Sequence, residues 1–470
     1  MKRKACFLLL LFGYLLTASA QPGVMYRLTL IDKGRPLYSI ERPEEFLSAK
    51  SIERRARQGL ALDASDLPID PAYFQALTEA GATVRASSKW LQTITVSFSD
   101  DAGITRIAAL PFVQTMTRVW SGDFGPDAPV CADVAADSTV ILHSMPSATE
   151  SAYGNALAQN GINQAIPLHE KGYKGKGITI AVIDAGFHDA DLYPAILDTT
   201  QIRGVKNFTH QAEHPYRSPE THGTLVLSCM LAHAPGKMIG TSPEACFHLL
   251  KTEVNGEEFP VEEDYWVAAL EYADSLGVDI VSSSLGYSTF TDTTLNHRPD
   301  ELDGHTIPAS RAASMAASKG MAVFLAAGNL GNGSWQKASV PADAKNILTV
   351  GAVKKDSTRA AFSSWGTLAD GRIKPDVMAL GQEVCLFHPH TGITTARGTS
   401  FATPLLAGMA ACLWGAVPAL SATELMALIR ESADRYDRPD EQYGYGIPNM
   451  EAAYLKAISR YGISNAIPIQ

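Results

Sequence analysis

The stretch Ile178-Thr179-Ile180-Ala181-Val182-Ile183-Asp184 decides the fold, because it is almost uninterruptedly apolar before it ends in a carboxylate. Such a run is typical of a parallel strand that is covered on both faces. Four further runs of this kind follow along the chain, at Cys246–Leu250, Val278–Val281, Met321–Ala326 and Ile347–Val350. Helical patterns lie between them, at Tyr265–Leu276 and Ser310–Lys319. This alternation predicts an α/β domain with a doubly wound, mostly parallel sheet.

The residues before this domain follow a different pattern, in which helices separate short strands of alternating polarity. We expect strands at Tyr26–Leu30, Leu91–Phe98 and Phe112–Val119, and helices at Glu44–Arg57, Pro71–Ala80 and after the capping residue Asp101. Elements of this size and order predict a small α+β domain of the ferredoxin-like type.

The first twenty residues are typical of a secretory signal peptide. A basic start at residues 2–4 precedes the apolar run Ala5–Leu16, and the small residues 18–20 form a cleavage site that would leave Gln21 first. The apolar run is shorter than the ~20 residues that span a bilayer, so we expect no membrane span after signal cleavage. A protein with such a leader is expected to be secreted or periplasmic.

The chain is predicted to have four parts. They are the signal peptide at residues 1–20, the small domain at 21–121, a linker at 122–160 and the large domain at 161–470. The linker begins where the helical and strand patterns give way to Gly, Pro, Asp and Ser, and we expect a processing site within it.

The composition fits a folded globular protein, with 46% hydrophobic and 19% charged residues. The net charge of −10 becomes −13 without the signal peptide, since that segment holds three cations and no Asp or Glu. No basic stripe stands out along the chain, which argues against nucleic acid as a partner.

Five cysteines remain after the signal peptide, and their odd number and scattered spacing predict neither a disulfide framework nor a zinc site. Cys229, Cys246 and Cys412 lie in apolar segments and are expected to be buried. Cys131 and Cys385 are candidates for a disulfide.

Four polar residues carry the candidate chemistry. Asp184 ends the first strand of the large domain and Asn329 follows the strand Met321–Ala326, so both belong to the carboxyl edge of the sheet, where sites gather in this architecture. His222 and Ser400 each stand near the start of a helical pattern. Each residue also has an ordinary structural interpretation, as a turn residue, a loop histidine or a helix N-cap.

As a set, the four residues supply what acyl transfer needs. Ser400 would attack the carbonyl carbon, His222 would accept and return the proton, and Asp184 would orient the imidazole. Asn329 would donate a hydrogen bond to the oxyanion. Because the N-terminus of a helix disfavours positive charge, we expect its dipole to help keep His222 neutral.

The segment Gly398-Thr399-Ser400-Phe401-Ala402-Thr403-Pro404 leads into an apolar helical pattern at Leu405–Val417. We expect a buried helix that is entered by a glycine turn and has Pro404 in its first turn. A membrane span is the other interpretation, but the apolar stretch is short and is broken by Thr403, Pro404 and Gly408.

From about Gly161 to Ala453 the chain resembles the subtilisin-like serine peptidases (subtilases). Three blocks carry the resemblance, namely Asp184-Ala185-Gly186, His222-Gly223-Thr224 and Gly398 to Pro404, in the order Asp, His, Ser. The segments around Asn329 and Ser282-Ser283-Ser284-Leu285-Gly286 agree, as do Phe362-Ser363-Ser364-Trp365-Gly366 and Lys374-Pro375-Asp376.

The resemblance implies a serine endopeptidase that acts on polypeptides through the triad Asp184, His222 and Ser400. The oxyanion would be held by Asn329 and the backbone N–H of Ser400, and extended substrate by Ser284, Leu285, Gly286, Ala327 and Gly328. The small domain would be a prodomain that assists folding and blocks the active site until it is cleaved. No cofactor is implied; structural calcium is common in such proteins, but no ligand loop is recognisable. We expect a monomer.

Three positions depart from the pattern of the family. Ala185 stands where Ser or Thr usually follows the aspartate, which removes a supporting hydroxyl but no reacting group. Phe401 stands where Met is commoner, and Leu225 is also unusual.

Two other functions remain alternatives. A catalytically silent binding protein of the same fold would normally have lost one of the reacting groups, and all of them are present here. A metallopeptidase could use His210 and His214, which fit an H-x-x-E-H pattern, but that motif needs a helix and Pro215 follows at once. For the small domain, an independent binding role is the alternative to a prodomain.

Overall fold

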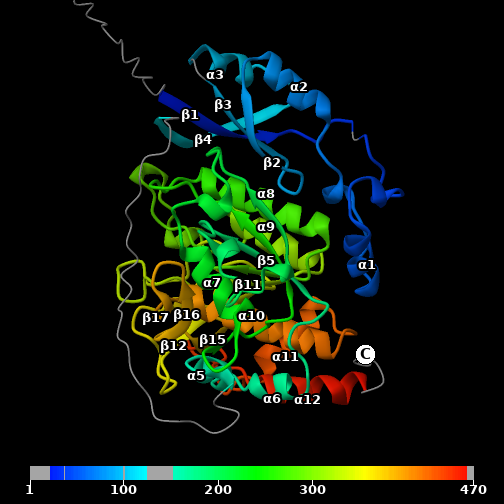
Figure 1. Ribbon diagram of the computed structural model, residues 1–470. Helices are drawn as coiled ribbons and strands as arrows, with labels where there is room; N and C mark the ends of the chain where they lie inside the picture. Colours follow the sequence, from blue (N-terminus) through cyan, green and yellow to red (C-terminus); the bar gives the residue numbers. More distant parts are fainter. Residues whose placement is uncertain (1–21, 36, 99–100, 124–151, 463–470) are drawn as a thin grey trace, which may run out of the picture.

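The computed structural model describes residues 22–35, 37–98, 101–123 and 152–462, and it shows a small domain seated on a large one (Figure 1). The predicted signal peptide, the middle of the predicted linker and Cys131 lie outside the described residues.

The large domain is built on a seven-stranded sheet with the order β15-β12-β11-β10-β5-β9-β6, in which neighbouring strands are parallel. The strand order reverses between β5 and β10, which confirms the doubly wound architecture. The strands are β5 (Thr179–Asp184), β6 (Ile202–Asn207), β9 (Cys246–Lys251), β10 (Ile280–Ser283), β11 (Ala322–Ala326), β12 (Leu348–Val353) and β15 (Val377–Leu380).

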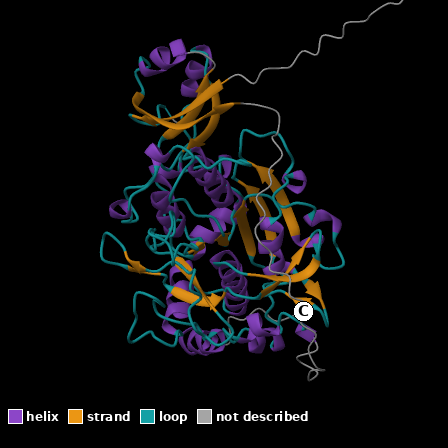
Figure 2. Cartoon of the chain, turned by 90° about the vertical axis from the view of Figure 1, so that its left-hand side faces the viewer, coloured by secondary structure: helices purple, strands orange, loops and turns teal. Residues whose placement is uncertain are grey.

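Helices cover both faces of this sheet, as Figure 2 shows. Ile180 and Val182 of β5 belong to the core on one face, with α7, α10, α11 and α12, whereas Ala181 and Ile183 belong to the core on the other face, with α8 and α9. Both faces of the strand are therefore buried, which explains its continuous apolar run. The helices are α5 (Leu157–Gly161), α6 (Ile166–Glu170), α7 (His222–Leu231), α8 (Val261–Leu276), α9 (Pro308–Ser318), α10 (Thr399–Ala416), α11 (Ala422–Glu431) and α12 (Met450–Tyr461).

Helix α10 begins earlier than its sequence pattern indicates. It starts at Thr399, so Pro404 lies inside the helix and not in its first turn. A proline there has no N–H to donate to the carbonyl four residues earlier, which is that of Ser400. The Ser284 hydroxyl donates to this carbonyl instead, at 2.7 Å. Within the described residues, only α10 is long and apolar enough to cross a membrane, and 94% of it is buried inside the protein, as in a core helix.

The small domain has a four-stranded antiparallel sheet with the order β2-β3-β1-β4 and the element sequence that the ferredoxin-like prediction requires. Strand β2 was not predicted. The predicted helix at 44–57 begins only at Ala49, because Ser48 caps it and Pro43–Glu45 form a separate 3-10 turn. The elements are β1 (Pro22–Leu30), α1 (Ala49–Arg57), α2 (Pro71–Glu79), β2 (Thr83–Ser88), β3 (Thr93–Phe98), α3 (Asp101–Ala108) and β4 (Val113–Asp123).

The small domain rests on α8 through buried polar contacts. Arg27 of β1 donates to Asp264 at 2.5 Å. Glu271 accepts a hydrogen bond from the Ser88 hydroxyl at 2.5 Å and from the backbone N–H groups of Lys89 and Trp90, each at 3.0 Å. Helix α1 reaches further down the side of the large domain (Figure 1), where its arginines meet the end of α8.

Short elements complete the described chain. The two-stranded ribbons are β7 (His233–Ala234) with β8 (Met238–Ile239), β13 (Gly366–Thr367) with β14 (Ile373–Lys374), and β16 (Val384–His388) with β17 (Gly392–Ala396). The 3-10 turns are η1 (Pro43–Glu45), η2 (Ala64–Asp66), η3 (Ala190–Leu192), η4 (Thr199–Gln201), η5 (Pro215–Arg217), η6 (Thr293–Leu295) and η7 (Pro299–Glu301).

The cysteines follow the prediction in part. Cys229 and Cys412 are buried, but Cys246 is only half-buried, because it starts β9 beside Arg203 and Gln201. Cys385 is buried and forms no disulfide with another cysteine of the described residues. Its pairing with Cys131 stays a prediction.

Candidate active site

Asp184 and His222 meet at the carboxyl edge of the sheet. Asp184 ends β5 with a side chain that is 0% exposed, and its Oδ1 lies 2.7 Å from Nδ1 of His222, the first residue of α7. The same oxygen accepts a hydrogen bond from the Ala185 N–H at 2.8 Å. The other oxygen, Oδ2, is buried and has no hydrogen-bond partner among the described residues. Ala185 stands where the family usually has Ser or Thr, and it therefore lies next to a carboxylate oxygen that accepts no hydrogen bond from the described residues.

The charge environment of His222 differs from the sequence expectation. Burial is the largest single effect and lowers the pKa of His222, but the Asp184 carboxylate, together with weaker contributions of other carboxylates, outweighs it, so that the pKa lies above its ordinary value. Glu220 and Glu253 add to this effect. These carboxylates favour the charged ring, and the expected opposite contribution of the helix dipole stays a prediction. Phe401 packs beside the imidazole, with the two ring centroids 5.8 Å apart.

Ser400 is the second residue of α10 and is 9% exposed. Its hydroxyl makes a hydrogen bond of 3.3 Å to the carbonyl of Ser284 and none to His222. His222 and Ser400 nevertheless line the same cavity. The structure thus brings the hydroxyl to the site of the Asp184–His222 pair, without a direct bond between base and hydroxyl.

Asn329 is oriented by the residue before Ser400. Its Oδ1 accepts from the backbone N–H of Thr399 at 2.9 Å and from the Thr399 hydroxyl at 3.0 Å. A backbone N–H can only donate, so the amide oxygen must face Thr399 and the Nδ2 group is left as a donor. Asn329 Nδ2 makes no hydrogen bond to another described residue.

Gly398 leaves space between two donors. Its φ of +155° lies in a region that favours glycine, and a Cβ built there would lie 3.6 Å from both Asn329 Nδ2 and the backbone N of Ser400. The absence of a side chain keeps open the position toward which both N–H donors can point. An oxyanion needs such a position.

The cavity that contains these groups has a volume of about 830 Å³. Of the residues that the sequence assigned to substrate binding, Ser284, Leu285, Gly286 and Gly328 line it. Ala327 does not; it is buried, its N–H donates to the carbonyl of Val350 and its carbonyl accepts from Ser339.

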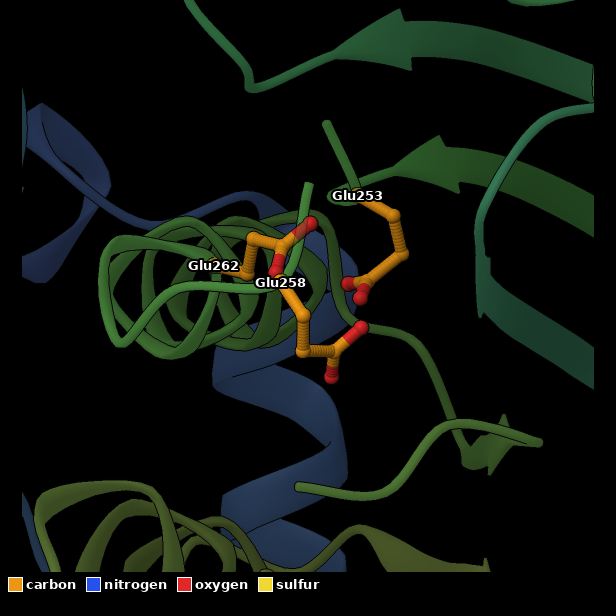
Figure 3. A group of neighbouring side chains, drawn as sticks. All are labelled: Glu253, Glu258 and Glu262. Carbon is orange, nitrogen blue, oxygen red and sulfur yellow. The ribbon is translucent and has the colours of Figure 1, made fainter. Parts of the chain in front are cut away.

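The cavity also has an acidic lining that the sequence analysis missed. Five glutamates line it, and its lining includes no lysine or arginine: Glu220, Glu253, Glu257, Glu258 and Glu262. Three of them converge, as Figure 3 shows, so that carboxyl oxygens of Glu253, Glu258 and Glu262 lie within 4.8 Å of one another. The available signal was the segment Glu253–Glu258, which follows a buried strand at the carboxyl edge of the sheet.

His210 and His214 do not form a metal site in the described residues. The segment between them is a loop and not a helix. His210 Nδ1 lies 3.1 Å from the Tyr265 hydroxyl, while the ring of His214 accepts from the backbone N–H of Tyr216 at 3.2 Å. The two histidines therefore have structural contacts of their own.

The site combines a hydroxyl, an imidazole oriented by a buried carboxylate, and two N–H donors around an open position. These are the groups that acyl transfer from an amide or ester requires. The conclusion still needs independent support, since folds host many functions.

Comparisons with known proteins supply that support. The model of the subtilase family matches residues 175–446, more than half of the chain, and the model of the Bacteroidota peptidase S8 propeptide domain matches residues 25–123. Subtilisin E of Bacillus subtilis (strain 168) is 30% identical over 298 residues, covering 62% of this chain and 70% of the relative. Subtilisin of Bacillus pumilus is 30% identical over 298 residues, covering 62% and 97%. The serine protease AprX of Bacillus subtilis (strain 168) is 29% identical over 337 residues, covering 65% and 71%. The chain therefore belongs to the subtilase family and is a serine-type endopeptidase with a propeptide domain.

Proposed function

We propose that this endopeptidase hydrolyses peptide bonds through an acyl-enzyme, with Asp184, His222 and Ser400 as its triad. One observation carries the proposal: the buried Asp184 carboxylate is 2.7 Å from Nδ1 of His222, and His222 lines the same cavity as Ser400. A bond at Nδ1 leaves Nε2 as the nitrogen that takes the proton from the hydroxyl.

The reaction begins when Ser400 Oγ turns from the Ser284 carbonyl toward His222. Catalytic hydrogen bonds are often long or misaligned before substrate binds, so the present orientation is compatible with this step. Oγ attacks the scissile carbonyl while His222 accepts its proton. His222 then gives the proton to the leaving amine, and water repeats the sequence to release the acid.

Asn329 Nδ2 and the backbone N–H of Ser400 are proposed as the oxyanion donors. The support is the orientation of the Asn329 amide by Thr399 and the open position beside Gly398. The substrate-binding roles of Ser284, Leu285, Gly286 and Gly328 are supported by their positions on the cavity wall. A backbone role for Ala327 has less support, because both of its backbone groups are engaged.

The propeptide domain is proposed to cover the site until it is cleaved from the large domain within residues 122–160. Its strand β4 reaches the cavity rim, where Trp120 Nε1 donates to Glu257 at 3.0 Å. The predicted signal peptide supports export of the chain, to the periplasm or the medium. N-terminal sequencing of the exported protein tests both parts, and a mature form that still starts at Gln21 would contradict the processing.

A serine-directed phosphonyl inhibitor tests the triad. We expect mass spectrometry of the processed protein to find the adduct on Ser400, and Asp184→Asn to slow its formation. Ser288→Ala is the matched control, because Ser288 lines the same cavity. Labelling of another serine would refute the assignment, and activity lost to a chelator alone would support the metal alternative.

A further inference from the structure

Glu253, Glu258 and Glu262 form one wall of the cavity that contains Ser400, and we call this set the acidic wall. Glu253 follows β9, Glu262 lies in the first turn of α8, and Glu258 comes from the loop between them (Figure 3). Their side chains converge from three points of the chain to one place in the cavity that Ser400 also lines.

Some carboxyl oxygens of the acidic wall already accept hydrogen bonds from other residues of the protein. Both oxygens of Glu262 accept backbone N–H bonds, from Val254 at 2.7 Å and from Phe259 at 3.0 Å. Glu253 Oε1 accepts from the hydroxyls of Tyr287 at 2.9 Å and Thr252 at 2.8 Å. These bonds fix the two side chains in place.

The remaining oxygens have no cation. Among the described residues, neither Glu253 Oε2 nor the Glu258 carboxylate has a hydrogen bond or an ion pair. Lys251 lies nearby, but its ammonium is held by Glu213 at 3.4 Å, by Asn255 Oδ1 at 3.4 Å and by the carbonyl of Glu253. The acidic wall therefore presents unpaired acceptors toward the cavity.

Gathering these carboxyls without a cation is unfavourable. Burial, with Glu253 and Glu263 nearby, raises the pKa of Glu258 to about 8. Burial, with a contribution of Asp184, raises the pKa of Glu253 to about 7. A ligand that brings positive charge would stabilise their ionised forms, because an opposite charge at close range favours ionisation.

The donor set fits an ammonium or guanidinium group better than calcium. Calcium takes about six to eight oxygen ligands. Here the Glu262 oxygens and Glu253 Oε1 are already engaged, which leaves one oxygen of Glu253 and the two of Glu258. A lysine ammonium has three N–H donors, which matches the number of free oxygens.

The acidic wall lies in the same cavity as the segment that we propose binds extended substrate. Ser284–Gly286, the proposed partner of extended substrate, lines the cavity together with residues 253–258. We propose that the acidic wall binds the side chain of a lysine or arginine residue on the acyl side of the scissile bond. This inference rests on the proposed function, and it makes the enzyme selective for polypeptides with a basic residue at one of the four positions before the cleavage site.

Pairs of internally quenched peptides test this selectivity in the processed enzyme. The peptides of a pair differ only by lysine or norleucine, a side chain of similar shape without charge, at one of the four positions before the scissile bond. At pH 9, where Glu253 and Glu258 are ionised, we expect lysine to raise kcat/KM about tenfold or more at one position, as a charge-assisted hydrogen bond would. Glu258→Gln should reduce this preference to about twofold. Reaction of the variant with the phosphonyl inhibitor shows that it is folded.

Glu220→Gln is the matched control, because it removes one carboxylate from the same cavity outside the acidic wall. It should retain the lysine preference. Equal cleavage of both peptides by the wild type at all four positions would overturn the inference and leave the proposed function intact. Failure to cleave any peptide, or to react with the phosphonyl inhibitor, would instead refute the proposed function. Calcium binding that is lost in Glu258→Gln, together with no lysine preference, would assign the wall to a metal and overturn the inference.

Discussion

Arg55 of the propeptide helix α1 joins the two domains in a buried network of charges. Its guanidinium lies 2.7 Å from Asp274 at the end of α8 and 2.9 Å from Asp66 of its own domain. Asp274 also binds Arg54 at 2.5 Å, and Asp66 also binds Lys319 of the large domain at 3.0 Å. Both carboxylates are 0% exposed, and Arg55 is 2% exposed. Arg55→Met keeps most of the side-chain volume but removes the charge.

The free energy of propeptide binding that Arg55→Met removes can be calculated from this network. Removing one partner from a buried ion pair costs about 3–5 kcal/mol. The lower end applies here, because Asp274 keeps Arg54 and Asp66 keeps Lys319. About 3 kcal/mol, at 1.4 kcal/mol per tenfold, corresponds to a cleaved propeptide that dissociates about 100-fold more readily.

The assay follows the lag before peptide hydrolysis reaches its full rate after the processed complex is diluted. Arg55→Met should shorten the lag about 100-fold, while the final rate is unchanged because the large domain is not altered. Arg57→Met is the matched control on the same helix: Arg57 is 36% exposed and 3.7 Å from Asp279, so it should change the lag less than about fivefold. A lag within twofold of the wild type in Arg55→Met would refute this account of the interface.

Three further predictions concern the site. Asn329→Ala should lower kcat about 10²–10³-fold with little change in KM, which is the effect known for an oxyanion donor of subtilisin. A rise in KM of the same size with kcat unchanged would instead indicate a role in substrate binding. The Asp184, Glu220 and Glu253 carboxylates raise the pKa of His222, and the base must be neutral, so kcat/KM should fall as pH drops through a midpoint above 6.5. Glu220→Gln should move that midpoint to lower pH. A wild-type midpoint below 6.5 would contradict the raised pKa of His222. Ala185→Ser places a hydroxyl beside Asp184 Oδ2, which has no hydrogen-bond partner among the described residues. Measured on one peptide, kcat/KM of the variant should exceed that of the wild type by up to about tenfold. A decrease would show that Oδ2 needs no donor.

The sequence revealed the central strands of the large domain because burial on both faces leaves a continuous apolar run. β5 shows this most clearly, with Ile180 and Ile183 in opposite cores. The edge strands β6 and β15 escaped prediction for different reasons. Every residue of β6 is half-buried or exposed, so it has no apolar run, and β15 is only four residues long. Tertiary position, and not local sequence, makes them strands.

The start of α10 shows a limit of local rules. Proline is expected in a first turn, so the pattern placed the helix start too late. The structure tolerates Pro404 further inside because Ser284, more than a hundred residues away along the chain, donates to the carbonyl of Ser400. Such a compensating bond is not visible in the sequence around the proline.

The proposed catalytic residues could be located from the sequence because each comes at the end of an apolar strand or at the start of a helical pattern. The cavity contains His222, Asn329 and Ser400 together. Their surroundings were less accessible to sequence reasoning. Of the carboxylates that raise the pKa of His222, Glu253 lies in the loop between β9 and α8, and the fold of this loop also brings Glu253 close to Glu258. Their roles in catalysis and specificity stay predictions.

The most direct test of the central claim is casein hydrolysis by Ser400→Ala, compared with the wild type at equal amounts of exported protein. We predict that Ser400→Ala loses activity by at least about 10⁴-fold and accumulates as the uncleaved precursor, because the variant lacks the proposed nucleophile of the acyl-enzyme. Ser288→Ala, from the same cavity, should stay within a few-fold of the wild type. Casein hydrolysis by Ser400→Ala within tenfold of the wild type would contradict the account.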